Sequence, residues 1–198
     1  MWLSLQVSAT ARRARVVAPL NERHALATAR LDLVPTEPGY AERTWTHLSD
    51  ERMWRFFPAM RPPTIEALRL RYERFAHPMP YLGAPERWEN WICIRREDEA
   101  AVGEAQATYA GASCYLAYGV FPAFQRQGFA REAMSAVLRH AHDVHRSRVA
   151  IAEMAASNAA SIGVARALGL VHVKSKPGEH VGYDGTVSVY RLQLRPSA

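Results

Sequence analysis

Lysine is almost missing from this 198-residue sequence. Lys174 and Lys176 are the only two, so the formal net charge of +6 comes from arginine. The sequence also lacks any basic run interleaved with aromatic residues, the pattern by which nucleic-acid-binding segments contact phosphates and bases. Its arginines are scattered among acids, as in Arg95-Arg96-Glu97-Asp98-Glu99. We therefore expect a solvated, arginine-rich surface and no nucleic-acid partner, and a basic nucleic-acid-associated protein is the least favoured of three functional hypotheses.

Cysteine is scarce as well. Cys93 and Cys114 lie in apolar, strand-like stretches, which is typical of small buried residues and provides no disulfide framework. His142 and His145 are three residues apart, but no third ligand is evident in the sequence, so we expect no metal. No apolar run is long enough to cross a bilayer, so we expect no membrane partner and a cytoplasmic location.

The hydrophobic content of 48% and the charged content of 22% are typical of a globular chain, and 198 residues suit one domain. We place that domain at residues 27–198 and expect residues 1–26 to form a loosely ordered extension. The extension has several arginines and no acid before Glu22, which is also typical of organelle transit peptides. The alternation between Trp2 and Val7 does not suit the amphipathic helix of a transit peptide, so the extension is preferred.

The order of periodic segments predicts an α/β chain of the α+β kind, with helices against a largely antiparallel sheet. Alternation and turn residues predict strands at 29–35, 88–95, 102–109, 113–121, 148–154, 170–174 and 186–194. Helical periodicity predicts helices at 40–48, 50–57, 64–76, 128–145 and 158–168. Thr64 is the expected N-cap of the third helix, and Gly169 the expected residue after the fifth. Asp184-Gly185 is the expected turn of the final hairpin.

The segment from Tyr118 to Ala133 is the most informative part of the chain. It contains a short apolar strand, a proline that cannot donate to a sheet, a glycine-containing loop and the first turn of a helix. The first amides of a helix have no intrahelical acceptor and lie at the positive end of its dipole, so such a site can hold a pyrophosphate. Gly119 indicates a bulge or the close approach of another backbone. Taken alone, Gly128 fits a simple helix entry equally well.

Three motifs together resemble one enzyme family. Gln125-x-x-Gly128-x-Ala130 at the head of a long helix resembles the acetyl-coenzyme A signature of the GCN5-related N-acetyltransferases. Downstream, Asn158-x-x-Ser161 followed by Ala167-Leu168-Gly169-Leu170 resembles the Asn-x-x-Ser helix of that family and its Leu-Gly-Phe ending. Thr28-x-Arg30-Leu31-x-Leu33 resembles a strand of the subgroup that includes the ribosomal-protein alanine acetyltransferases. The resemblance covers roughly residues 27–194, and it implies the family's mixed, mostly antiparallel twisted sheet flanked by helices.

The resemblance also implies where acetyl-CoA, the co-substrate, would bind. Main-chain amides from Gln125 to Arg131 would hold the pyrophosphate, and the strand Tyr118-Gly119-Val120 would pair with the pantetheine arm, with an amide near Val120 facing the thioester oxygen. Asn158 would contact the arm. The residues that the resemblance assigns to the coenzyme are Tyr118, Gly119, Val120, Gln125, Arg126, Gln127, Gly128, Phe129, Ala130, Arg131, Asn158 and Ser161.

Direct acetyl transfer to an amine requires a group that takes the amine proton and a group that protonates the departing thiolate. Relatives often use a glutamate before the pyrophosphate loop and a tyrosine on the later helix, and Tyr115 and Ala165 stand at the matching positions here. The resemblance makes Ser161 the candidate near the sulfur, although its hydroxyl fits a local bond to an amide equally well. Glu153 and Glu104 are the candidate bases, with solvated strand carboxylates as the alternative.

The implied function is therefore that of an N-acetyltransferase, an acyltransferase acting on a primary amine of a protein N-terminus, an amino acid or another small molecule. The missing glutamate and tyrosine support an alternative of the same fold, a non-catalytic module that binds acyl-CoA or a partner. Aromatic residues of the first half, such as Trp54 and Tyr72, fit either the core or an amine pocket. The family often forms homodimers, but the sequence leaves the oligomeric state of this chain open.

Overall fold

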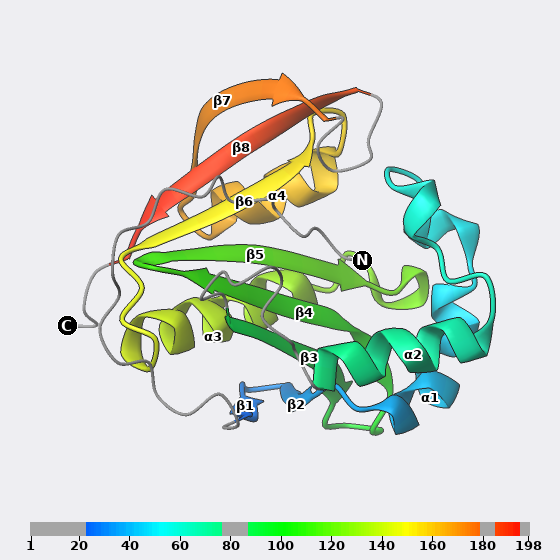
Figure 1. The fold of residues 1–198 in the computed structure, drawn as a ribbon. Helices are drawn as coiled ribbons and strands as arrows, with labels where there is room; N and C mark the ends of the chain where they lie inside the picture. The colour runs from blue at the N-terminus through cyan, green and yellow to red at the C-terminus, as the bar shows by residue number, and fades with distance from the viewer. Residues whose placement is uncertain (1–22, 77–86, 179–184, 195–198) are drawn as a thin grey trace.

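A computed structural model describes residues 23–76, 87–178 and 185–194, and it forms one eight-stranded sheet with helices on both sides (Figure 1). The strand order is β1-β2-β3-β4-β5-β6-β8-β7, and every neighbouring pair is antiparallel except β5 and β6. The strands are β1 (Leu26–Ala27), β2 (Leu31–Pro35), β3 (Arg87–Arg95), β4 (Ala101–Ala110), β5 (Ser113–Val120), β6 (Val149–Ala155), β7 (Val171–Pro177) and β8 (Thr186–Gln193). The α-helices are α1 (Ala41–Leu48), α2 (Ile65–Ala76), α3 (Phe129–Asp143) and α4 (Ala159–Ala167). The predicted α+β fold with a mostly antiparallel sheet is confirmed.

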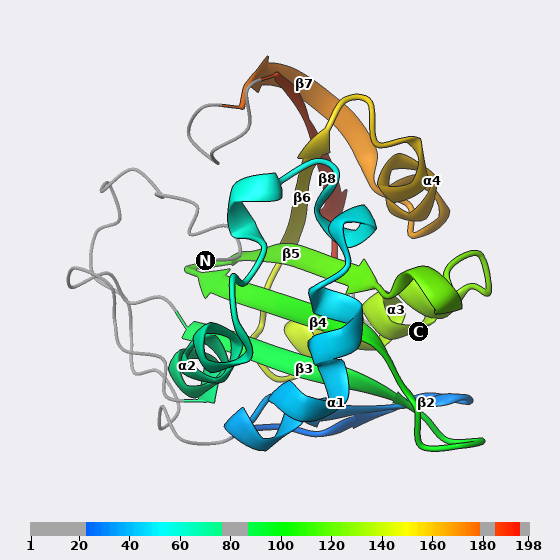
Figure 2. The same cartoon turned by 90° about the vertical axis from the view of Figure 1, so that its right-hand side faces the viewer.

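The two faces of the sheet carry separate hydrophobic cores. Helix α3 lies against one face of the central strands, and α1 and α2 lie against the other (Figure 2). The α3 side buries residues such as Met134 and Val137, whereas the α1 and α2 side buries residues such as Leu68 and Tyr72. Two of the aromatic residues left open by the sequence, Trp54 and Tyr72, therefore belong to this second core.

Strand β4 shows how one alternating pattern serves both faces. Ala105, Ala107 and Tyr109 belong to the α3-side core. Glu104 and Gln106, which alternate with these residues along the strand, are polar yet buried, and they line a cavity on the other face. Because successive side chains of a strand point to opposite faces, this alternation places the polar side chains of Glu104 and Gln106 on the α2 side of the sheet.

Element boundaries differ from the predictions where the backbone leaves the helical region. The α-helix predicted for 50–57 is wrong, since only a 3-10 helix, Glu51–Trp54, forms there. Proline disfavours the helical region for the residue before it, and Phe57 precedes Pro58 with φ −140° and ψ 62°. The helix predicted for 128–145 begins at Phe129 and ends at Asp143, so His145 lies in the segment after it.

The described part of the chain begins inside the region predicted as an extension. Residue Leu26 pairs with Leu33 across β1 and β2, and the Arg23 guanidinium binds the Glu37 carboxylate at 2.6 Å. Leu26 thus belongs to the sheet and Arg23 contacts the segment after β2, whereas residues 1–22 lie outside the described part. Asp184 of the predicted hairpin turn also lies outside it. Among the described residues, none of the helices has the length and apolar character needed to cross a membrane.

Candidate active site

The two parallel strands at the centre of the sheet separate before they end. Strands β5 and β6 pair only from Ser113–Val149 to Leu116–Ala152. Beyond that point β5 continues to Val120 along β4, and β6 continues to Ala155 along β8. Their facing edges therefore carry main-chain groups that none of the described strands pairs, and an extended ligand can bind such groups as an added strand would.

Glycines allow β4 and β5 to approach closely beside this opening. A Cβ atom on Gly103 would lie 2.3 Å from the carbonyl oxygen of Gly119, so only glycine fits at position 103. The Gly119 carbonyl is thus the group that approaches Gly103 closely, and Gly103 is the residue that must lack a side chain. This close contact holds the last residues of β5, Tyr118 to Val120, against β4. These residues border the gap where β5 and β6 no longer pair, which we call the opening.

A loop with two left-handed residues joins β5 to α3. A 3-10 helix, Pro122–Phe124, leads into Arg126 at φ 65° and Gly128 at φ 83°, and α3 starts at Phe129. Within the described residues, the amides from 126 to 131 have no hydrogen-bond acceptor, and the first bond is made by the Glu132 amide to the Gly128 carbonyl at 3.1 Å. These amides lie at the positive end of the helix dipole, so the loop can hold a phosphate group.

Hydrogen bonds from Thr28 and Arg30, in the segment before β2, to α3 and to the loop hold this loop in place. The carboxylate of Glu132 accepts hydrogen bonds from the Thr28 hydroxyl at 2.6 Å and from the Arg30 guanidinium at 2.7 Å. Arg30 also donates to the Gln127 carbonyl at 3.1 Å and lies over the Phe129 ring. Burial acts to raise the pKa of Glu132, but these hydrogen bonds outweigh it and lower that pKa. The Thr28-x-Arg30 motif therefore positions the loop.

The groove beside the loop is electropositive. It is lined by Arg30, Gly128, Arg131 and Arg139, with Glu132 as the acid among them. Arg126, Gln127 and Gly128 are exposed, so no described residue covers the loop. The Gln125 side chain turns back to donate to the Val120 carbonyl at 3.1 Å. This arrangement favours a ligand with several negative charges.

Helix α4 reaches the other side of the opening. The Asn158 side chain caps it by accepting a hydrogen bond from the Ser161 amide at 3.1 Å. The Tyr118 hydroxyl donates to the Ser161 carbonyl at 3.1 Å, and burial raises the pKa of Tyr118 to about 12. None of the described residues bonds the Ser161 hydroxyl. The structure therefore brings Tyr118, Asn158 and Ser161 together at the separation of β5 and β6.

A cavity on the α2 side of the sheet adjoins the same strand. Its lining includes Phe75, Asn90, Glu104, Gln106 and Tyr118. Three buried polar atoms have no partner among the described residues and belong to this lining: Asn90 Nδ2, Glu104 Oε2 and Gln106 Nε2. An unpaired buried polar group is costly, so three together indicate a place for a polar ligand.

Glu104 is the carboxylate of this cavity. Its backbone pairs with Gly119 of the separated strand, and its Oε1 accepts a hydrogen bond from the Tyr72 hydroxyl. Burial raises the pKa of Glu104, while the Tyr72 hydrogen bond and the charge of Arg71 act in the opposite direction. A raised pKa makes a carboxylate a better proton acceptor than an exposed one, which is the direction that a general base requires.

Glu153, the other candidate base, has a different environment. It lies on β6 beyond the separation point, and its Oε1 pairs with the Lys176 ammonium at 2.9 Å. The Glu153 side chain is only 7% exposed, so the ion pair is largely shielded from water. The Glu153 Oε1 atom is therefore already engaged by a cation, whereas Glu104 Oε2 has no partner among the described residues.

Several contacts and residues around these sites were missed by the sequence analysis, including the role of Arg30, which was named only as part of a motif. Arg30 and Glu132 are 102 positions apart, so their contact follows only from the fold. Asn90 and Gln106 are direct cross-strand partners, and both interrupt apolar strands. A polar residue at a buried strand position was the available signal for them. The histidines near Glu89 were also missed as a group, because they come from three separate segments.

Comparisons with known proteins agree with this geometry. The chain matches the Acetyltransferase (GNAT) domain family over residues 30–171. A GNAT-family acetyltransferase from Bacillus anthracis superposes with a TM-score of 0.72 at 19% identity, covering 86% of this chain and 98% of that one. No curated protein matches the sequence.

Two solved neighbours carry coenzyme A. RimL, a ribosomal L7/L12 α-N-protein acetyltransferase in complex with coenzyme A, superposes with a TM-score of 0.71 at 15% identity, covering 86% of this chain and 98% of that one. Spermidine N-acetyltransferase from Vibrio cholerae, in complex with coenzyme A and spermine, gives 0.69 at 14% identity, covering 83% and 96%. At these identities the likeness concerns the fold.

Proposed function

The chain belongs to the GNAT acetyltransferase family, and from that premise we propose that it transfers the acetyl group of acetyl-CoA directly to a primary amine held beside Glu104. In this reaction the amine nitrogen attacks the thioester carbon, the carbon–sulfur bond breaks, and the thiolate takes up a proton. Glu104 accepts the proton that the amine loses. The acceptor is a protein N-terminus, an amino acid or another small amine.

The coenzyme lies along the opening between β5 and β6. Its pyrophosphate binds the unpaired amides of residues 126–131, with Arg126 and Arg131 nearest in sequence to its charge. Its pantetheine arm runs along Tyr118 to Val120 as an added strand, and α4, capped by Asn158, lies across from it. An amide near Val120 donates to the thioester oxygen, and one such donor is typically worth about 3 kcal/mol in the transition state.

The acid and base roles are assigned by environment. Glu104 is the base because one of its oxygens has no partner among the described residues and its pKa is raised by burial. Ser161 is the proton donor to the thiolate, because no described residue bonds its hydroxyl and its carbonyl is tied to Tyr118. Glu153 serves to hold β6 to β7 through Lys176.

One observation carries the proposal. The backbone of Glu104 pairs with Gly119, so the only unpaired carboxylate oxygen of the described cavity belongs to a residue next to the strand that the coenzyme arm would follow. An amine between the two would have a proton acceptor on one side and the thioester on the other. Proximity of this kind lowers the barrier because the reactants are already oriented.

Replacement of Gly128 tests the coenzyme part. Gly128→Glu places a carboxylate in the loop, so binding of acetyl-CoA should weaken by at least about 100-fold while the protein stays folded, measured by titration calorimetry. Gly111→Glu is the matched control, because Gly111 also has a positive φ, of 56°, and a Cβ there meets nothing within 4 Å. Equal affinity in Gly128→Glu and in the wild-type protein would refute the assignment of the loop.

A coenzyme-release assay against a mixed library of amines and peptides tests turnover. The proposal expects release of coenzyme A that saturates with at least one acceptor. Tight binding of acetyl-CoA without release across the library would favour the alternative, a module that binds acyl-CoA without catalysis. That outcome would leave the coenzyme site standing and remove the role of Glu104.

A further inference from the structure

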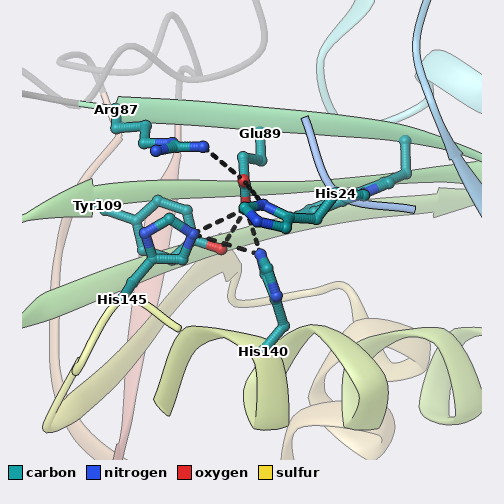
Figure 3. Close-up of polar contacts among 7 residues, drawn as sticks. His24, Arg87, Glu89, Tyr109, His140 and His145 are labelled. Carbon is teal, nitrogen blue, oxygen red and sulfur yellow. Dashed lines mark hydrogen bonds and ion pairs between the residues drawn. The ribbon is translucent and has the colours of Figure 1, made fainter. Parts of the chain in front are cut away.

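A second group of side chains lies at the other end of α3, between the helix and the sheet. It surrounds the carboxylate of Glu89 on β3, and Figure 3 shows the His24, His140 and His145 rings directed toward that carboxylate. His140 comes from the last turns of α3, His145 from the segment after it, and His24 from the segment before β1. His140 lies eleven positions after Phe129 along the helix, a rise of about 17 Å, so this group is distinct from the candidate active site.

The nitrogen and oxygen atoms of this group converge on a small volume. Glu89 Oε2 lies 2.7 Å from His140 Nε2 and 3.1 Å from His145 Nε2, and the two Nε2 atoms are 3.3 Å apart. His24 Nδ1 lies 3.0 Å from Glu89 Oε1. One ligand atom from each of the four residues lies within 4.8 Å of the other three.

These spacings are close to those around a tetrahedral metal ion. Zinc binds histidine nitrogen and carboxylate oxygen at about 2.0–2.2 Å, which separates neighbouring ligand atoms by about 3.3–3.6 Å. The 3.3 Å between the two histidine nitrogens already matches, and the 2.7 Å and 3.1 Å distances from Glu89 Oε2 need to open by roughly 0.2–0.6 Å. The four ligand atoms lie within 4.8 Å of one another, so the widest separation needs to close by roughly 1 Å when the ion binds. Three imidazoles and one carboxylate also form a donor set that suits zinc rather than magnesium or calcium, which prefer oxygen alone.

The surrounding residues orient the ligands. The Tyr109 hydroxyl donates to Glu89 Oε2 at 3.0 Å, and its ring stacks on His145 with centroids 3.8 Å apart. The Trp91 indole donates to the His24 carbonyl at 2.6 Å, which fixes the backbone that carries this histidine. Arg87 contacts Glu89 Oε1 at 3.2 Å. Such outer partners hold a metal ligand in one orientation and tune its basicity.

We propose that His24, Glu89, His140 and His145 form a structural binding site for a divalent transition-metal ion, with zinc as the expected occupant. The ion joins the segment before β1 to β3, to the C-terminal part of α3 and to the segment that follows α3. Four protein ligands complete a tetrahedral shell and leave no position for substrate, so the ion has no part in acetyl transfer. Its effect is on stability, because an ion that binds the folded chain shifts the folding equilibrium.

The test uses the full chain, first treated with a chelator and then titrated with Co²⁺ or Zn²⁺. We expect one equivalent to bind with a Kd below about 1 µM, the visible absorption of tetrahedral Co²⁺ to appear, and the melting temperature to rise. His24→Gln and His145→Gln should each weaken binding at least about tenfold. His24 is the safest position for substitution, since its side chain is 29% exposed.

His142→Gln is the matched control. His142 lies on α3, one turn from the group, and its Nδ1 contacts the Asp143 carboxylate instead. Its replacement should leave metal affinity unchanged. The proposal is overturned if the folded, chelated protein binds no Zn²⁺ or Co²⁺ at about 10 µM, if His24→Gln and His145→Gln bind as tightly as wild type, or if His142→Gln weakens binding as much as they do. Coenzyme affinity is expected to be the same with and without metal, which separates this test from that of the proposed function.

Discussion

Two buried glutamates on neighbouring strands have opposite surroundings. Glu89 on β3 has both oxygens occupied by Arg87, Tyr109 and the histidines. Glu104 on β4 has one oxygen bonded by Tyr72 and one without a described partner. Burial alone raises the pKa of each carboxyl, but the histidine hydrogen bonds reverse this effect at Glu89 and lower its pKa well below the usual range, whereas at Glu104 the raised pKa remains.

Both carboxyls are buried, so the difference between their pKa values comes from their hydrogen-bonding and ionic partners. Glu89 is ionised at any physiological pH, so it can anchor cations but cannot exchange protons. Burial raises the pKa of Glu104, so this carboxyl holds a proton more readily than an exposed one, which is the direction that favours its proposed role as a base. The same substitution at the two positions should therefore have different consequences.

The largest expected effect is on catalysis at Glu104. Glu104→Gln keeps an oxygen that can accept from Tyr72 but removes the proton acceptor, so kcat should fall by about 10²- to 10⁴-fold. The KM for acetyl-CoA should change little, because the proposed coenzyme site is made of other residues. Steady-state release of coenzyme A measures both constants. Glu153→Gln is the control, and a loss of activity there as large as at Glu104 would transfer the role of base to Glu153.

At Glu89 the expected effect is on stability. Glu89→Gln removes the charge that faces the Arg87 guanidinium, whose side chain is 8% exposed, and breaking such a buried pair typically costs about 3–5 kcal/mol. Urea unfolding of the chelator-treated protein measures the loss. Because the pKa of Glu89 is lowered in the folded state, its contribution is present above the unfolded pKa and disappears as pH falls through the folded value, so the difference from wild type should narrow in acid.

Glu104→Gln should change the unfolding free energy by less than about 1 kcal/mol, since it removes a charge that burial disfavours. The raised pKa of Glu104 gives the opposite sign, with its contribution present below the unfolded pKa and lost as pH rises through the folded value. Equal destabilisation by the two Gln variants would remove the distinction between them.

The sequence predicts these two residues unequally. Periodicity places both glutamates on strands, and the motif of residues 125–130 predicts the loop because its chemistry is local and made by the main chain. Glu104 was named as a candidate base from its strand position. The surroundings of Glu89 could not be predicted, because His24 and His140 lie 65 and 51 positions away from it in sequence. Side-chain groups that assemble from distant segments depend on strand register and helix packing, which local patterns do not determine.

The smallest expected effect comes from the one hydrogen bond that Glu104 receives. Because the Tyr72 hydroxyl donates to Glu104 and lowers its pKa, Tyr72→Phe should raise that pKa by about half to one unit, as expected for the loss of a bond worth about 1 kcal/mol. The acid limb of the pH profile of kcat/KM, where activity rises as Glu104 loses its proton, should move to higher pH by that amount. The plateau should change much less.

Tyr72 also contacts the Thr44 hydroxyl at 2.9 Å, so Thr44→Val is the control that alters the tyrosine's surroundings without removing its bond to Glu104. It should leave the acid limb within about 0.2 units of wild type, since the carboxylate keeps its donor. A second check combines Tyr72→Phe with Glu104→Gln, in which the acid limb should no longer respond to the tyrosine. If Tyr72→Phe shifts the limb by the same amount when residue 104 is glutamine, the titrating group is not Glu104, and the contrast between the two carboxylates would then concern stability alone.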